Sequence, residues 1–127
     1  MVLNVAACLV VGAGKYDHIT PATRDVLHWL PVPQRILFKM ALTAFDSTRG
    51  TGPAYFKGVC IPLSDVSGRS NLHSVGRGDM FVPRTRTLLG RRSFLIAAPL
   101  IWNSLPGDLR STTISHEQFR APLKTHL

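Results

Sequence analysis

Apolar residues recur at helical spacing in several stretches of this 127-residue chain. The clearest stripe lies in the range 33–47, where the apolar side chains fall on one face of a helix. Near the C-terminus, Phe119, Leu123 and Leu127 share a face behind Ser115, which begins a capping box. The pattern predicts helices over residues 1–12, 20–30, 33–47 and 115–127, with a short helix over 54–56.

The first predicted helix differs from the others because it has almost no polar face. Only Asn4 interrupts the apolar run before Gly12 and Gly14, which we expect to end the helix. A helix that is apolar on all sides is normally buried, so we expect this one to be covered by other protein. Its abrupt start at the first residue is what we expect where a preceding segment has been cut off. The second helix is expected to begin at Thr20-Pro21 and to stop at the next proline.

The middle of the chain predicts a small β element. Residues 62–77 are rich in Ser, Gly and Asn and are expected to form a loop. Met80 to Thr87 is predicted as a short strand that Pro83 confines to a sheet edge, and Phe94 to Ala98 as a short buried strand. A helical turn is expected to start at Pro99.

The predicted fold class is therefore mainly α with a small β element (α+β). The 127 residues are expected to form a single small domain or a truncated domain fragment. Its parts would be a helical part over 1–60, an Arg-rich loop and strand part over 61–110, and a C-terminal helix over 111–127.

The charge is strongly uneven. The chain has 15 Lys and Arg against 7 Asp and Glu, for a formal net charge of +8. Between residues 69 and 92 there are six Arg and one acid, Asp79. Guanidinium groups bind phosphates with two parallel hydrogen bonds and stack on bases, and Phe81 and Phe94 lie among them. We predict that nucleic acid is bound by Arg77, Arg84, Arg86, Arg91 and Arg92. The alternative is a solvated basic loop, or arginines paired with helix C-termini and carboxylates.

The remaining chemistry points to no enzyme, metal or cofactor. The five His are scattered without the spacing of a metal site, and His28 beside Trp29 is predicted to be a packed aromatic. The single Glu and the dispersed Asp do not form the acidic cluster that a two-metal polymerase or nuclease needs. The sequence shows no nucleophile motif. Cys8 and Cys60 are predicted to be buried thiols.

Three short motifs are interpreted as chance matches. Gly12 to Lys15 imitates a phosphate-binding loop but lacks the first Gly and the final Ser or Thr. Arg77-Gly78-Asp79 spells an integrin-type tripeptide, for which a basic turn is the simpler interpretation. The apolar N-terminus lacks the basic residues of a signal peptide, and no apolar run is long enough to span a membrane. We expect an intracellular protein of the nucleus or cytoplasm, neither secreted nor bound to a membrane.

Short motifs follow one another in order along the chain. They are Asp17-His18-Ile19-Thr20-Pro21, Leu27-His28-Trp29-Leu30-Pro31-Val32, Gln34-Arg35-Ile36, Phe38-Lys39, Arg77-Gly78-Asp79, Val82-Pro83-Arg84-Thr85-Arg86, Gly90-Arg91-Arg92-Ser93-Phe94, Trp102-Asn103-Ser104-Leu105-Pro106, Asp108-Leu109-Arg110 and Leu123-Lys124-Thr125-His126-Leu127. In wording and order they resemble the C-terminal region of the reverse transcriptase of LINE-type (non-LTR, jockey-like) retrotransposons. The stretch Thr48 to Gly52 departs from the family pattern, as does the missing Ser-Gly before Pro99. Such drift is typical of a decayed or truncated copy.

The resemblance implies a segment downstream of the polymerase palm and thumb, without the catalytic aspartate pair. The expected function is that of a non-catalytic C-terminal fragment that binds RNA or DNA through its Arg-rich segment. One alternative is an interaction fragment, whose apolar first helix packs on the rest of the reverse transcriptase or on a second copy. Another is a degraded open reading frame without autonomous function, against which cooperative thermal unfolding would count.

Overall fold

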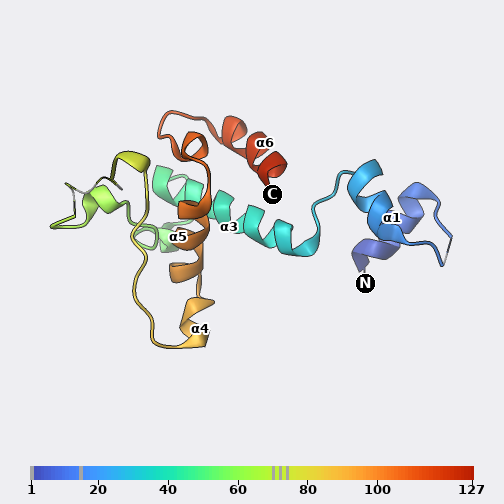
Figure 1. The fold of residues 1–127 in the computed structure, drawn as a ribbon, viewed down its shortest axis with the longest axis horizontal. Coiled ribbons are helices and arrows are strands. Elements are labelled where there is room, and N and C mark those ends of the chain that lie inside the picture. Colours follow the sequence, from blue (N-terminus) through green and yellow to red (C-terminus); the bar gives the residue numbers. More distant parts are fainter. Residues whose placement is uncertain (1, 15, 70, 72, 74) are drawn as a thin grey trace. The chain divides into compact units, whose positions relative to one another are not determined.

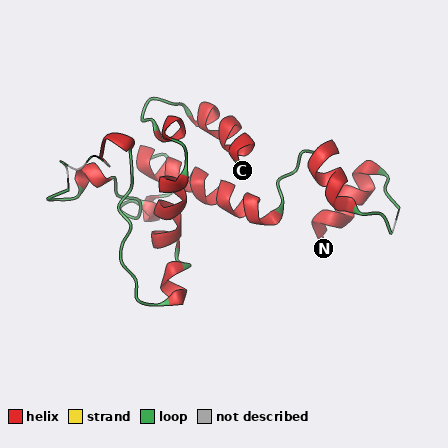
Figure 2. Ribbon diagram, viewed as in Figure 1, coloured by secondary structure: helices red, strands yellow, loops and turns green. Residues whose placement is uncertain are grey.

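The computed structural model describes all residues except 1, 15, 70, 72 and 74, and it is mainly α-helical (Figures 1 and 2). It is 61% helical, and the described residues contain no strand, so the mainly α prediction is confirmed and the β element is not. The helices are α1 (Val2–Val11), α2 (Ile19–Pro21), α3 (Val32–Arg49), α4 (Leu88–Arg91), α5 (Phe94–Ser104) and α6 (His116–His126). A π-helical turn covers Ala22–Val26, and 3₁₀ turns cover Ala54–Phe56, Leu63–Asp65, Val75–Arg77 and Gly107–Arg110. The chain forms two compact units, residues 1–36 and 37–127.

In the first unit, α1 packs against α2 and the π-helical turn. It ends as predicted at Gly12, whose positive φ of 70° is a conformation that glycine adopts without strain. Within this chain α1 is covered only in part: Ala7 is its only buried residue, while Val2 and Leu9 are 84% and 79% exposed. Its cover by other protein stays a prediction. Two very short helical elements cannot cover all sides of a ten-residue helix.

The second predicted helix, over 20–30, is shorter than expected. It begins at Ile19, with His18 rather than Thr20 at the capping position, and its π-helical turn ends at Val26. His28 then takes a positive φ of 49°, and the N–H of Trp29 donates to the carbonyl of Thr23 at 2.8 Å. His is among the residue types that tolerate this conformation at a helix end. The ring of His28 is exposed, so its prediction as a packed aromatic is wrong.

The core of the second unit forms where α3, α5 and α6 meet. The ring of Phe45 on α3 stacks on Phe119 of α6 with 4.4 Å between centroids, and Trp102 of α5 lies 5.8 Å from Phe119. Ala41 and Ala44 are fully buried on the same side of α3, so the small side chains let other elements approach closely. Helix α6 begins with the predicted capping box between Ser115 and Gln118.

The predicted buried strand over 94–98 is the first half of α5, so that prediction is wrong. A run of five apolar residues fits a buried helix as well as a strand. Ile96 and Ala98 are buried, and Trp102, one helical turn after Ala98, continues the same face. Pro99 lies inside α5 rather than at the start of a helix.

The predicted strand over 80–87 is also absent, because a side chain takes the place of a second strand. Met80 forms one isolated antiparallel bridge with Pro62. On its other edge, the backbone N–H of Met80 donates to Asn103 Oδ1 at 2.7 Å, and Asn103 Nδ2 donates to the Met80 carbonyl at 2.9 Å. One amide therefore satisfies both backbone groups that would otherwise continue a sheet, and Pro83 has no N–H to extend it.

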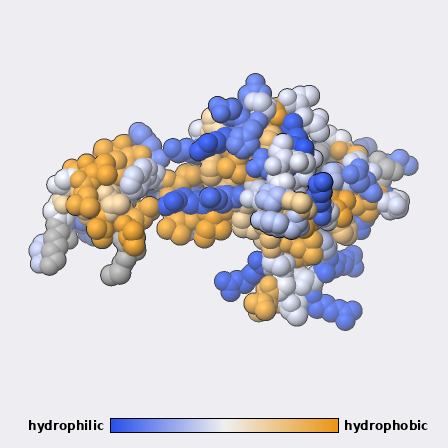
Figure 3. Space-filling model, turned by 180° about the vertical axis from the view of Figure 1, so that it is seen from behind, coloured by the Kyte–Doolittle hydropathy of each residue, from blue (hydrophilic) through white to orange (hydrophobic). Residues whose placement is uncertain are grey.

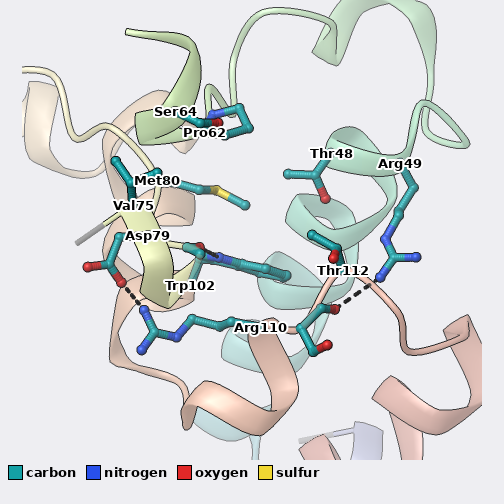
Figure 4. Close-up of a pocket in the computed structure, with 12 residues that line it drawn as sticks. Thr48, Arg49, Pro62, Ser64, Val75, Asp79, Met80, Trp102, Arg110 and Thr112 are labelled. Atoms are coloured by element: carbon teal, nitrogen blue, oxygen red, sulfur yellow. Dashed lines mark hydrogen bonds and ion pairs between the residues drawn. The ribbon is translucent and has the colours of Figure 1, made fainter. Parts of the chain in front are cut away.

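Residues 78–80 are held by the side chains of Trp102 and Asn103 on α5 and of Arg110 on the 3₁₀ turn after it. Figure 4 shows Trp102 and Arg110 beside Asp79 and Met80. Besides the Asn103 pair, Trp102 Nε1 donates to the Gly78 carbonyl at 2.9 Å, and Arg110 forms an ion pair with Asp79. Gly78 has a positive φ of 68°, and a Cβ there would lie 3.0 Å from the Arg110 carbonyl. We call this set of contacts the clamp. The integrin-like tripeptide is part of it, since the Asp79 carboxylate is mostly buried against Arg110.

The clamp predicts a large effect of a small change at Asn103. An Asn103→Leu variant keeps a similar volume but leaves the N–H and C=O of Met80 without partners. Leaving a buried polar group unpaired costs about 1–3 kcal/mol, so we expect the free energy of unfolding to fall by about 2 kcal/mol. Urea unfolding followed by circular dichroism measures it. The neighbouring Ser104→Ala, at an exposed hydroxyl, is the control. Equal stabilities of the two variants would contradict the clamp.

Candidate nucleic-acid interface

The Arg-rich segment leaves the clamp and returns to it as a protruding arm, residues 81–93. It runs without regular secondary structure from Phe81 to Thr85, bends at Arg86 and Thr87, passes through the short helix α4, and re-enters the fold where α5 begins (Figure 1). The turn is ordered by its own hydroxyls, because Thr87 caps α4 by accepting from the Gly90 N–H at 3.0 Å. A Cβ at position 90 would overlap the hydroxyls of Thr85 and Thr87, so this turn requires glycine.

Four arginines of the arm are exposed and lie close together. Arg84, Arg86 and Arg91 line one open depression with a volume of about 610 Å³, whose floor includes Ile96 and Leu100. Arg92 follows at the end of α4 and is also exposed. The arm contains no Asp or Glu, so its formal charge is +4. Phosphate oxygens are the chemical group that such an uncompensated cluster of guanidinium groups fits best.

The fifth predicted residue, Arg77, lies elsewhere. It ends the 3₁₀ turn Val75–Arg77, and its Nε is 3.9 Å from the Asp79 carboxylate. The structure thus brings three of the five predicted arginines to one depression, leaves Arg92 exposed beside Arg91 at the end of α4, and places Arg77 at the clamp. Burial, and after it the nearby charge of Arg77, lowers the pKa of the Arg110 guanidinium below its usual value.

The two aromatic residues among the arginines are engaged inside the protein. The ring of Phe94 packs on Phe56 with 4.7 Å between centroids. The ring of Phe81 is covered by Arg69, whose guanidinium lies 5.4 Å from its centroid. Neither ring is therefore placed to stack on a base.

What the sequence interpretation missed is a pair of leucines at the end of the arm. Leu88 and Leu89 open α4 and are 80% and 79% exposed. Figure 3 shows hydrophilic residues on both sides of the protruding arm and apolar surface at its end. The sequence did carry a signal, since two adjacent leucines stand between two pairs of arginines directly after a capping Thr.

A second cavity, of about 270 Å³, lies beside the clamp and is lined by Trp102, Met80 and several polar side chains (Figure 4). The two arginines that line this cavity already have partners within the protein. Arg49 donates to the Ser111 carbonyl at 3.2 Å with its guanidinium over the Phe45 ring, and Arg110 pairs with Asp79. Arg110 Nε remains a buried donor without a protein acceptor. The cavity belongs to the clamp and presents no catalytic arrangement.

Other candidate chemistry is sparse in the part of the chain that the structure describes. No group of three or more His, Cys, Asp or Glu is placed to hold a metal ion there. Cys60 is buried as predicted, and burial raises the pKa of its thiol, whereas Cys8 is only partly buried. Lys15, the last residue of the loop-like match at 12–15, lies outside the described residues. No described helix is long and apolar enough to cross a bilayer.

Comparisons with protein-family models, with curated proteins and with solved structures find no match for this chain.

Proposed function

We propose that this chain is a non-catalytic C-terminal segment of a LINE-type reverse transcriptase, and that it binds the phosphate backbone of RNA or DNA through the arm. The observation that carries the binding proposal is the exposed group of Arg84, Arg86 and Arg91 around a depression that has no acidic residue, with the exposed Arg92 next to Arg91 in the chain.

The competing interpretation is that these arginines serve the fold. Elsewhere in the second unit, arginines do so: Arg110 and Arg77 pair with Asp79, and Arg49 donates to a backbone carbonyl. Among the described residues, no ion pair or side-chain hydrogen bond is recorded for the four arm arginines. Keeping four like charges together at an exposed site opposes folding slightly, so a structural role does not account for them.

The family assignment is supported by the sequence resemblance and by where three of its motifs lie. The motifs at 77–79, 102–106 and 108–110 come together in the clamp, although more than 20 residues separate the first from the second. Residues that depend on one another in this way fit a segment with its own fold.

The binding proposal predicts a steep dependence on salt. The chain is titrated with single-stranded RNA over a series of salt concentrations. The logarithm of the binding constant should fall linearly with the logarithm of the salt concentration, and the slope should steepen by about 0.7 for each phosphate contact. Replacing Arg84 and Arg86 by Ala should make the slope shallower by about 1.4. The double variant Arg24→Ala/Arg35→Ala removes the same charge from exposed sites in the first unit and should leave the slope almost unchanged.

Absence of binding at low salt, or a slope that both double variants change equally, would overturn the role of the arm. The second outcome would mean that only the net charge matters.

A second candidate function is association through α1, which the exposure of Val2, Val5 and Leu9 favours. These residues are spaced three and four apart and so share one face. If a second copy covers that face, sedimentation equilibrium should show a concentration-dependent dimer that Leu9→Lys abolishes and Leu100→Lys, on α5, leaves intact. A monomer at every concentration would count against it.

A further inference from the structure

Leu88 and Leu89 are the first two residues of α4, at the turn of the arm. They are 80% and 79% exposed, so nothing in the described structure covers them. Arg84 and Arg86 precede them, and Arg91 and Arg92 follow. Exposed leucines are common singly, but an exposed apolar pair flanked in the sequence by four arginines is typical of a contact surface.

The arm lacks what a single-strand binder normally uses. Proteins that hold single strands stack the bases on aromatic rings, and both aromatic rings near the arm are occupied by Phe56 and Arg69. The arm presents instead two exposed leucine side chains on the short helix α4, between arginines that precede and follow them in the sequence. In proteins that bind duplex DNA, leucine side chains inserted between base steps act as wedges that kink the helix, while arginines contact the minor groove and its phosphates.

Side chains that insert between base steps need a rigid backbone behind them, and hydrogen bonds within the turn around α4 hold that backbone in place. The Thr87 side chain caps α4, the Ser93 hydroxyl donates to the Gly90 carbonyl at 2.6 Å, and Gly90 packs directly on Thr85. The base of the arm is fixed on one side by Met80 in the clamp and on the other by α5.

An anionic membrane surface would also attract four arginines, but the apolar part fits it less well. Two leucines bury little surface, and no Trp or Tyr lies in the arm to sit at the headgroup level.

We propose that the arm binds double-stranded DNA, with Leu88 and Leu89 inserted between base steps and Arg84, Arg86, Arg91 and Arg92 on the flanking phosphates. This rests on the proposed function of the arm and adds its target and its mode of contact. Flexible pyrimidine–purine steps would be preferred, because they cost least to unstack.

The test uses the full chain and a short DNA duplex with a central TA step and a fluorophore at each end. Binding should raise energy transfer between the ends because the duplex bends. In the variant Leu88→Ala/Leu89→Ala the rise in energy transfer should be lost, and the affinity for the duplex should fall at least tenfold. The dependence of the affinity on salt should stay unchanged, because the arginines remain. The variant Val32→Ala/Ile36→Ala removes an exposed apolar pair from α3, outside the arm and outside the α1 face, and should bend the duplex like the unaltered chain. Circular dichroism confirms folding of both variants.

The other outcomes are distinguishable. If the chain binds the duplex with the same salt dependence but does not bend it, the leucine insertion is overturned. Bending that persists in the leucine variant overturns it as well. In both cases the proposed phosphate contacts still stand. Tighter binding to single-stranded RNA than to the duplex overturns the duplex target. Leucine-dependent binding to phosphatidylserine vesicles without duplex binding overturns it in favour of a membrane. Failure to bind any nucleic acid overturns the proposed function itself.

Discussion

The paired hydrogen bonds between Asn103 and Met80 are the constraint on which the second unit depends. They fix a non-helical segment to the last turns of α5, and the indole of Trp102 and the guanidinium of Arg110 hold Gly78 and Asp79, the two residues before Met80. Because Trp102 also belongs to the aromatic core with Phe45 and Phe119, the clamp joins this segment to the packing of α3 and α6. The arm starts one residue after Met80, so its position follows from the clamp.

The clamp and the arm divide the positive charge between two roles. Arg110 lies in the interior, where burial and the neighbouring Arg77 disfavour its charge, and Asp79 compensates it. The arm has four arginines and no acid, and its turn is held by hydroxyl groups and a glycine rather than by ion pairs. Charges that do not hold the fold together remain available to a partner, which is why we place nucleic-acid binding in the arm.

Sequence patterns predicted what depends on local periodicity and missed what depends on distant contacts. Helix α3 and the capping box of α6 follow from residues within one or two turns of each other, and the arginine cluster is visible in the sequence itself. The segment 80–87 had strand-like residues, but Asn103, 23 positions away, takes the partner's place. The apolar run at 94–98 carries no period that separates a strand from a helix. The sequence shows the leucine pair between two pairs of arginines, but its exposure is set by the turn around Gly90.

The central claim, that the four arm arginines contact nucleic acid directly, is best tested by NMR of the arginine side-chain Nε–Hε signals during titration with a short DNA duplex. We predict that the signals of Arg84, Arg86, Arg91 and Arg92 shift or broaden at low salt, while those of Arg24 and Arg35 stay in place. Equal shifts at all exposed arginines, or shifts confined to residues outside the arm, would contradict the account.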